Sequence, residues 1–144
     1  MTATIHDALI AMNVIGYEID GYDIHSEDEF INHFRRRTHF DSDGVGQFTS
    51  DPDRFGVTWD QIQNKKNELD NARPMLVLRM RRDKFLKQTD WVVTKAMEEG
   101  KKVPTKWKTY RQALRDLPAT VEPKLEDGVL TNAVSYTHLT LPTK

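Results

Sequence analysis

One stretch decides the fold of this 144-residue chain, and it reads Trp107-Lys108-Thr109-Tyr110-Arg111-Gln112-Ala113-Leu114-Arg115-Asp116-Leu117-Pro118. Four apolar residues in it fall at i, i+3, i+7 and i+10, which is the spacing of one face of an α-helix. These residues are Trp107, Tyr110, Leu114 and Leu117. Pro104 suits the first turn of such a helix, and Pro118 is expected to stop it. The stretch therefore predicts a helix whose buried face carries two large rings.

A second helical stretch covers residues 58–88, on the N-terminal side of the first. Apolar residues recur in it every seven positions, at Ile62, Leu69 and Leu76. Pro74 lacks the backbone N–H that a helix needs, and its ring clashes with the preceding turn. We therefore expect two segments, about 58–72 and 74–88, or one helix that is kinked at the proline.

The residues between these two stretches predict a helical hairpin. Thr89-Asp90-Trp91 indicates a break that places the indole at a corner, and the polar residues 95–103 indicate a loop. The first arm of the hairpin carries Met75, Leu78, Arg82, Phe85 and Leu86. We expect Trp91 to fill the gap between the arms. We also expect ion pairs between the carboxylates and guanidinium groups of Asp83, Asp90, Arg111 and Arg115.

Three helix starts are visible as capping sequences in which a hydroxyl residue precedes a polar partner by three positions. They are Thr4 with Asp7, Ser26 with Glu29, and Thr58 with Gln61. After the second of them, Phe30, Ile31 and Phe34 form a helical stripe. Each sequence predicts where a helix begins and carries no information about function.

Strands are expected between these helices. Residues 14–20 alternate, with Ile15, Tyr17 and Ile19 on one face, which is the period of a strand with one solvated side. Residues 45–49 predict a second strand, and residues 55–57 a third extended piece. Helices must cover one face of so small a sheet, because isolated ribbons are marginally stable.

The expected fold class is therefore α+β. A small N-terminal α+β unit with a two- or three-stranded sheet occupies residues 1–57. A long kinked helix and a C-terminal helical hairpin occupy residues 58–118, and residues 119–144 form an extended tail.

Composition excludes several classes of protein. The chain has no cysteine, which excludes disulfides, thiol catalysis and cysteine-ligated metal sites. No apolar run approaches the ~18–20 residues that span a membrane, and the N-terminus lacks a signal-peptide pattern. We expect a soluble protein that folds in a reducing compartment.

Sequence patterns for catalysis and metal binding are absent. Asp41-x-Asp43-Gly44 resembles the start of a calcium loop, but Pro52 stands where that loop needs glutamate, so a turn is the better interpretation. The histidines His6, His25, His33 and His39 lack metal-ligand spacing. There is no phosphate-binding glycine loop and no nucleophile elbow. We expect no enzyme, no metal and no cofactor.

Charge is divided unevenly along the chain. Residues 1–60 hold 12 acidic and 4 basic residues, whereas residues 61–117 hold 15 basic and 7 acidic ones. The two regions could attract each other, or either could steer a charged partner. A basic region interleaved with Trp107 and Tyr110 could also bind nucleic acid, but their place in the apolar stripe favours burial of both rings.

Residues 78–118 resemble the phage tail assembly chaperone family of tailed bacteriophages, and also the C-terminal parts of tail fibre assembly proteins. The family pattern is Arg-Asp-x-Leu-Leu, then Thr-Asp-Trp, then Trp-x-x-Tyr-Arg-x-x-Leu-Arg-Asp-Leu-Pro. Two departures are Phe85, where the family often has leucine, and a longer, more basic segment between Asp90 and Trp107. The matching residues are Arg82, Asp83, Leu86, Thr89, Asp90, Trp91, Trp107, Tyr110, Arg111, Leu114, Arg115, Asp116, Leu117 and Pro118.

The resemblance implies a non-enzymatic helper that binds a phage tail or tail fibre protein in the host cytoplasm and prevents its premature association. Such a role needs an exposed apolar strip with charge around it. The candidate partner-binding residues are Met75, Leu78, Arg79, Met80 and Arg82. Two alternatives stay open, namely a structural component of the virion tail and a nucleic-acid-binding protein that uses residues 61–117.

The last residues have a different character. Residues 135–144 resemble translated adapter sequence of the kind found at the ends of some metagenomic reading frames. We therefore expect residues from about 133 onward to be non-native, and we assign them no function.

Overall fold

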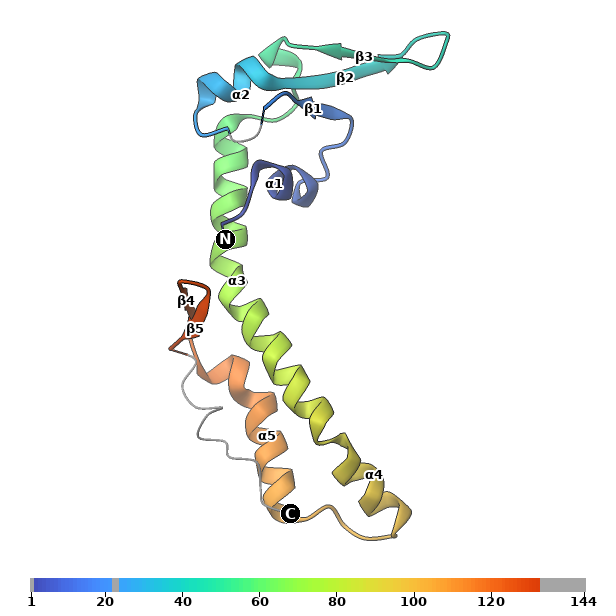
Figure 1. Ribbon diagram of the computed structural model, residues 1–144, viewed down its shortest axis with the longest axis vertical. Coiled ribbons are helices and arrows are strands. Elements are labelled where there is room, and N and C mark those ends of the chain that lie inside the picture. Colours follow the sequence, from blue (N-terminus) through green and yellow to red (C-terminus); the bar gives the residue numbers. More distant parts are fainter. Residues whose placement is uncertain (1, 22–23, 133–144) are drawn as a thin grey trace. The chain divides into compact units, whose positions relative to one another are not determined.

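The computed structural model describes residues 2–21 and 24–132 of the chain. It divides into two compact units, Met1–Asn71 and Ala72–Lys144. The expected α+β class is confirmed, with a three-stranded sheet in the first unit and a helical hairpin in the second. Helix α3 (Trp59–Gln88) contributes its first part to the first unit and its later part to the second (Figure 1).

Helix α3 is continuous through Pro74, so the two separate segments are not found. A proline inside a helix removes one i→i−4 hydrogen bond at a cost of ~3 kcal/mol or more. Here the missing bond would have gone to the carbonyl of Asp70, and the helix continues on both sides of the gap. The Asp70 side chain meanwhile accepts a hydrogen bond from the Ala3 backbone N–H at 2.7 Å, within the first unit.

The first unit combines helices α1 (Ile5–Ala11) and α2 (Glu27–His33) with an antiparallel sheet in the order β1-β2-β3 (Figure 1). Its strands are β1 (Tyr17–Ile19), β2 (Phe34–Phe40) and β3 (Gly46–Thr49), and a short 3₁₀-helix, η1, follows at Pro52–Arg54. Phe30, Phe34 and Phe55 lie in its core, with Leu9 and Ile62.

All three predicted helix starts are confirmed. The Thr4 hydroxyl accepts a hydrogen bond from the Asp7 N–H at 3.1 Å, and the Asp7 carboxylate accepts one from the Thr4 N–H at 2.8 Å. Thr58 and Gln61 make the same reciprocal pair, at 3.2 and 3.0 Å. Ser26 caps α2 by accepting from the Glu29 N–H. Because these signals act within one turn, the sequence alone is enough to read them.

The strands of the first unit differ from expectation in three places. Helix α2 ends at His33, and Phe34 opens strand β2, which the sequence did not indicate. Gly16 adopts a positive φ of 66°, so β1 begins at Tyr17 and Ile15 is 66% exposed. Residues 55–57 are not a strand, although Phe55 and Val57 are buried.

The second unit contains the predicted helical hairpin. Helix α5 (Thr105–Thr120) runs beside the later part of α3, and α4 (Asp90–Glu98) extends the first arm (Figure 1). Two clusters hold the arms together. One contains Leu78, Leu117 and Leu130, and the other contains Val92, Trp107, Tyr110 and Leu114, with Phe85 and Leu86 packed against it.

Three local expectations for the second unit are wrong. Residues 95–98 are helical and not part of a loop. Helix α5 continues through Pro118 to Thr120, whose hydroxyl donates to the Leu117 carbonyl at 3.1 Å. The segment after it is not an extended tail but an antiparallel hairpin of β4 (Lys124–Glu126) and β5 (Val129–Thr131).

The turn of this hairpin explains why a strand pair forms so soon after α5. Asp127 and Gly128 both have positive φ, at 49° and 76°, which suits a two-residue turn that matches the twist of antiparallel strands. Leu130 on β5 then packs against Leu78 and Leu117. The expectation of a non-native end concerns residues 133–144, which lie outside the described residues.

Within residues 2–21 and 24–132, no helix combines the length and the apolar character that a membrane span requires.

Candidate partner-binding site

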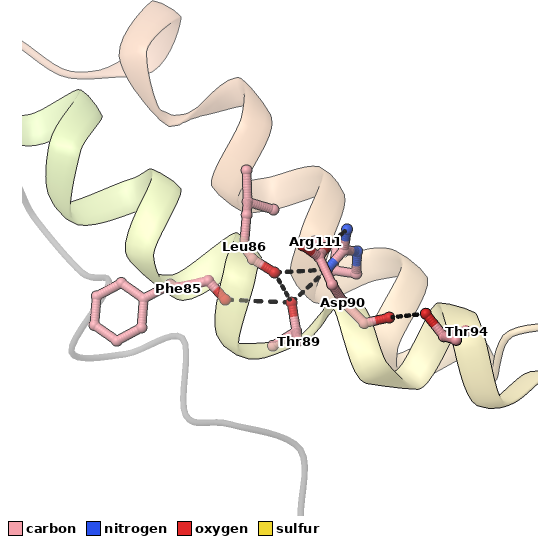
Figure 2. Close-up of polar contacts among 6 residues, drawn as sticks. All are labelled: Phe85, Leu86, Thr89, Asp90, Thr94 and Arg111. Carbon is pink, nitrogen blue, oxygen red and sulfur yellow. Dashed lines mark hydrogen bonds and ion pairs between the residues drawn. The ribbon is translucent and has the colours of Figure 1, made fainter.

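The junction between α3 and α4 is held by a buried arginine from α5. Arg111 donates from Nη1 to the Leu86 carbonyl at 2.9 Å and to the Thr89 hydroxyl at 2.5 Å. Its Nη2 donates to the Asp90 carboxylate at 2.7 Å (Figure 2). We call these four residues the Arg111 clasp. They join the two arms of the hairpin by hydrogen bonds as well as by apolar packing.

The Arg111 clasp satisfies the end of helix α3. The last carbonyls of a helix have no partner within it, and a cation near them is favoured by the helix dipole. The fully buried Thr89 hydroxyl donates to the Leu86 carbonyl at 2.9 Å, and Arg111 reaches the same oxygen (Figure 2). Asp90 lies in the first turn of α4, where a negative charge is favoured. Thr89 and Asp90 therefore form the joint between α3 and α4 within the first arm.

The expected ion pairs are confirmed in part. Asp90 pairs with Arg111, as predicted. Asp83 instead pairs with its neighbour Arg82, with Nη2 and Oδ1 2.7 Å apart. Arg115 and Asp116 are exposed on α5, where the Asp116 carboxylate accepts a hydrogen bond from Gln112 at 2.8 Å. Arg115 therefore lies on the solvated face, whereas Arg111 ties the arms together.

The rings of the hairpin form an edge-to-face series. Trp107 and Tyr110 are buried, as the stripe predicted, with ring centroids 6.1 Å apart and planes at 87°. Burial raises the pKa of the Tyr110 phenol, which keeps it neutral. Trp91 meets Trp107 edge-on at 6.0 Å but is 46% exposed, so it does not fill the gap between the arms.

The five candidate partner-binding residues have different surroundings. Leu78 is fully buried, and Met75 is half-buried against the cluster that contains Leu78. Arg82 is half-buried in its pair with Asp83. Arg79 and Met80 are exposed. Partner binding by these residues stays a prediction. Because Leu78 is buried in the core cluster, it can support the exposed face of α3 but does not itself lie on the surface.

Sequence reasoning missed an exposed residue beside this group. Leu76 was expected to continue the seven-residue pattern of Ile62 and Leu69, yet it is 54% exposed. Met80 follows it at i+4 and is 72% exposed. Residues four apart are neighbours on a helix surface. Leu76 and Met80 therefore form an exposed apolar pair, which we call the α3 strip, with Arg79 next to it in the sequence.

No candidate metal centre emerges in the part of the chain that the structure describes, where no group of three or more His, Cys, Asp or Glu residues is placed to hold an ion. Asp41 forms the turn that the sequence favoured over a calcium loop. Its Oδ1 accepts from the Val45 N–H at 2.8 Å and the Asp43 N–H at 3.1 Å, and Gln47 donates to its Oδ2 at 2.7 Å. The Val45 hydrogen bond is the main cause of a lowered pKa for Asp41.

Comparison with known protein families gives a match within the second unit. Residues 75–126 match the family model described as phage tail assembly chaperone protein. The match begins on α3, includes all of α4 and α5, and ends with β4. No curated protein and no solved structure matches the chain. The resemblance is thereby confirmed, and residues 75–126, roughly a third of the chain, match the phage tail assembly chaperone family.

Proposed function

We propose that this chain is a non-enzymatic assembly chaperone that binds an apolar segment of a phage tail or tail fibre component through the α3 strip. The family match supports the general kind of function, and a chaperone family suggests a role without catalysis. By covering the segment, the protein would keep it from associating before the tail is built. We propose that this takes place in the cytoplasm of the infected host.

The observation that carries the proposal is the α3 strip itself. Leu76 and Met80 expose apolar surface on one helix face, inside the segment that matches the family. Burying such a side chain fully stabilises a complex by about 1.5–3 kcal/mol. Methionine adapts its shape to different partners, and Arg79 can lay its alkyl stem on apolar surface while its charge stays in water.

The hairpin gives this strip a firm support. Leu78, between the two exposed residues, is fully buried against Leu117 and Leu130. The Arg111 clasp fixes the far end of the same helical arm. A helix held in this way loses little conformational freedom when a partner binds, which favours affinity.

Co-expression with the tail proteins of the source phage tests the proposal. The doubly substituted chain Leu76→Asp/Met80→Asp should recover several-fold less tail protein in a pull-down than the unchanged chain, and the soluble fraction of that tail protein should fall. Ile10→Asp is the matched control, because Ile10 is 70% exposed on α1 in the first unit.

Recovery of no tail protein by the unchanged chain would contradict the proposal. An equal loss of tail-protein recovery in the Ile10→Asp control and in the double variant would contradict it as well. Circular dichroism of each purified variant checks that helix content is retained, so that a loss of binding is not a loss of folding.

A further inference from the structure

A pocket lies on the second unit, away from the α3 strip in sequence. It is formed by α4, by the segment that follows α4, and by the start of α5, and it has a volume of about 470 Å³. Pockets of about 300–1,000 Å³ are typical of sites that enclose a small group. Its apolar lining comes from Trp91, Val92, Ala96, Pro104 and Trp107.

The lining of this pocket includes an indole that the chain covers only in part. Trp91 is half-exposed, whereas Trp107 beside it is buried and meets it edge-on. Exposed tryptophan in a concave apolar setting is typical of the anchor positions of protein interfaces. With Val92 and Ala96 also in the lining, the pocket suits one inserted apolar side chain.

The rim of the pocket is strongly cationic. Lys95, Lys101, Lys102 and Lys106 line it, and among the described lining residues Glu99 is the one that is acidic. Glu99 lies 3.0 Å from Lys101 Nζ and 3.8 Å from Lys95 Nζ. Exposed ion pairs of this kind contribute only ~0–1 kcal/mol, so an incoming carboxylate can replace them at little cost.

We propose that this pocket binds an acidic peptide segment that inserts one apolar side chain against Trp91 and places its carboxylates on the lysine rim. Charge complementarity selects the acidic segment, and the apolar part of the lining selects the anchor. A nucleic acid fits less well, because successive bases stack on several exposed rings, and of the two indoles in this lining only Trp91 is exposed while Trp107 is buried. The site goes beyond the function proposed above and does not depend on the α3 strip.

Fluorescence anisotropy with the full chain and a labelled peptide tests this inference. The probe is fluorescein-Gly-Asp-Glu-Phe-Asp-Glu-Gly, with a second probe in which serine replaces phenylalanine. The phenylalanine probe should bind about tenfold more tightly than the serine probe, and its affinity should fall as salt is raised. Equal binding of the two probes would overturn the proposal, because the pocket would then be unused.

Matched variants locate the binding. Lys101→Glu/Lys102→Glu and, separately, Trp91→Ser should each weaken binding of the phenylalanine probe about tenfold. Lys84→Glu/Lys87→Glu makes the same charge change at exposed lysines of α3 outside the pocket and should have a much smaller effect. An equal loss of affinity for the phenylalanine probe in both double-lysine variants would contradict binding at this pocket.

Nucleic acid is tested in the same assay. A labelled oligothymidylate strand should bind more weakly than the phenylalanine probe and should not displace it at equal concentration. Displacement at equal concentration would overturn the assignment of a peptide ligand. The peptide assay does not use tail proteins, so a negative result would not contradict the proposed chaperone function. A negative pull-down, in turn, would not contradict peptide binding in the pocket.

Discussion

The Arg111 guanidinium lies 2.7 Å from the Asp90 carboxylate, and through this contact α5 is tied to the start of α4. The same guanidinium reaches the Leu86 carbonyl, where α3 ends. An arginine in a basic segment would ordinarily belong to a solvated face. Here it is buried and completes the hydrogen bonding of two helix ends, so it determines how the hairpin closes.

Replacing this arginine should weaken the second unit. Arg111→Met keeps much of the apolar stem but removes the donor to the buried Thr89 hydroxyl and one of the donors to the Leu86 carbonyl, which still accepts from Thr89. We expect a loss of about 1–3 kcal/mol in the free energy of unfolding. Arg115→Met, at an exposed position on the same helix, should change it by less than about 0.5 kcal/mol. Urea unfolding followed by tryptophan fluorescence measures both, and equal effects would refute the role given to Arg111.

The two indoles of the hairpin should contribute unequally to stability. Trp107 is buried in the second apolar cluster, so Trp107→Ala should cost about 3–5 kcal/mol in the free energy of unfolding. Trp91→Ala should cost clearly less, since nearly half of its surface is already in water. Thermal unfolding followed by circular dichroism shows which variant loses more stability. A larger loss of stability in Trp91→Ala than in Trp107→Ala would contradict the packing described.

The turn formed by Asp41 should depend on pH in the acidic range. Hydrogen bonds, chiefly from Val45, lower the folded-state pKa of Asp41 below its ordinary value of 3.8. The ionised carboxylate therefore stabilises the turn above pH 3.8, and this contribution is lost as the pH falls through the lower folded-state pKa. An NMR titration of the Asp41 carboxyl carbon should give a midpoint below 3.8. A midpoint at or above that value would show that the turn does not favour the charged form.

The β4–β5 turn should require a residue that tolerates positive φ. Gly128→Ala meets no neighbouring atom within 4 Å, so its cost comes from the backbone alone, about 1–2 kcal/mol. Gly128→Asn should cost less, because asparagine accepts this conformation more readily. Amide hydrogen exchange of Leu130, which packs against Leu78, reports the loss. Equal protection in the two variants would argue against a turn of this type.

These features differ in how far the sequence could predict them. The helix starts at Thr4, Ser26 and Thr58 and the stripe from Trp107 to Leu117 were predictable, because each depends on residues within a few turns of one another. Strand β2 was not, since Arg35, Arg36 and Arg37 give it no alternation of apolar and polar residues.

The β4–β5 hairpin and the exposure of Leu76 depend on tertiary packing, which the sequence did not reveal. The Asp127-Gly128 pair is a hairpin signal that the sequence contained, but Pro118 and Pro123 made a tail the simpler interpretation. In α3, the seven-residue pattern grouped Leu76 with Ile62, whereas packing against α5 selects Leu78 and leaves Leu76 exposed. Which face of a helix is covered is decided by its neighbour, so Met80 could be proposed for the α3 strip from the sequence but Leu76 could not.

Site-specific photo-crosslinking tests the central claim most directly, namely that the α3 strip holds a tail component. A photoreactive amino acid would replace Met80 in one sample and Ile10 in another, each co-expressed with the tail proteins of the source phage. The account predicts a covalent adduct with a tail protein from position 80 and none from position 10. The absence of an adduct at position 80, or equal adducts from both positions, would contradict it.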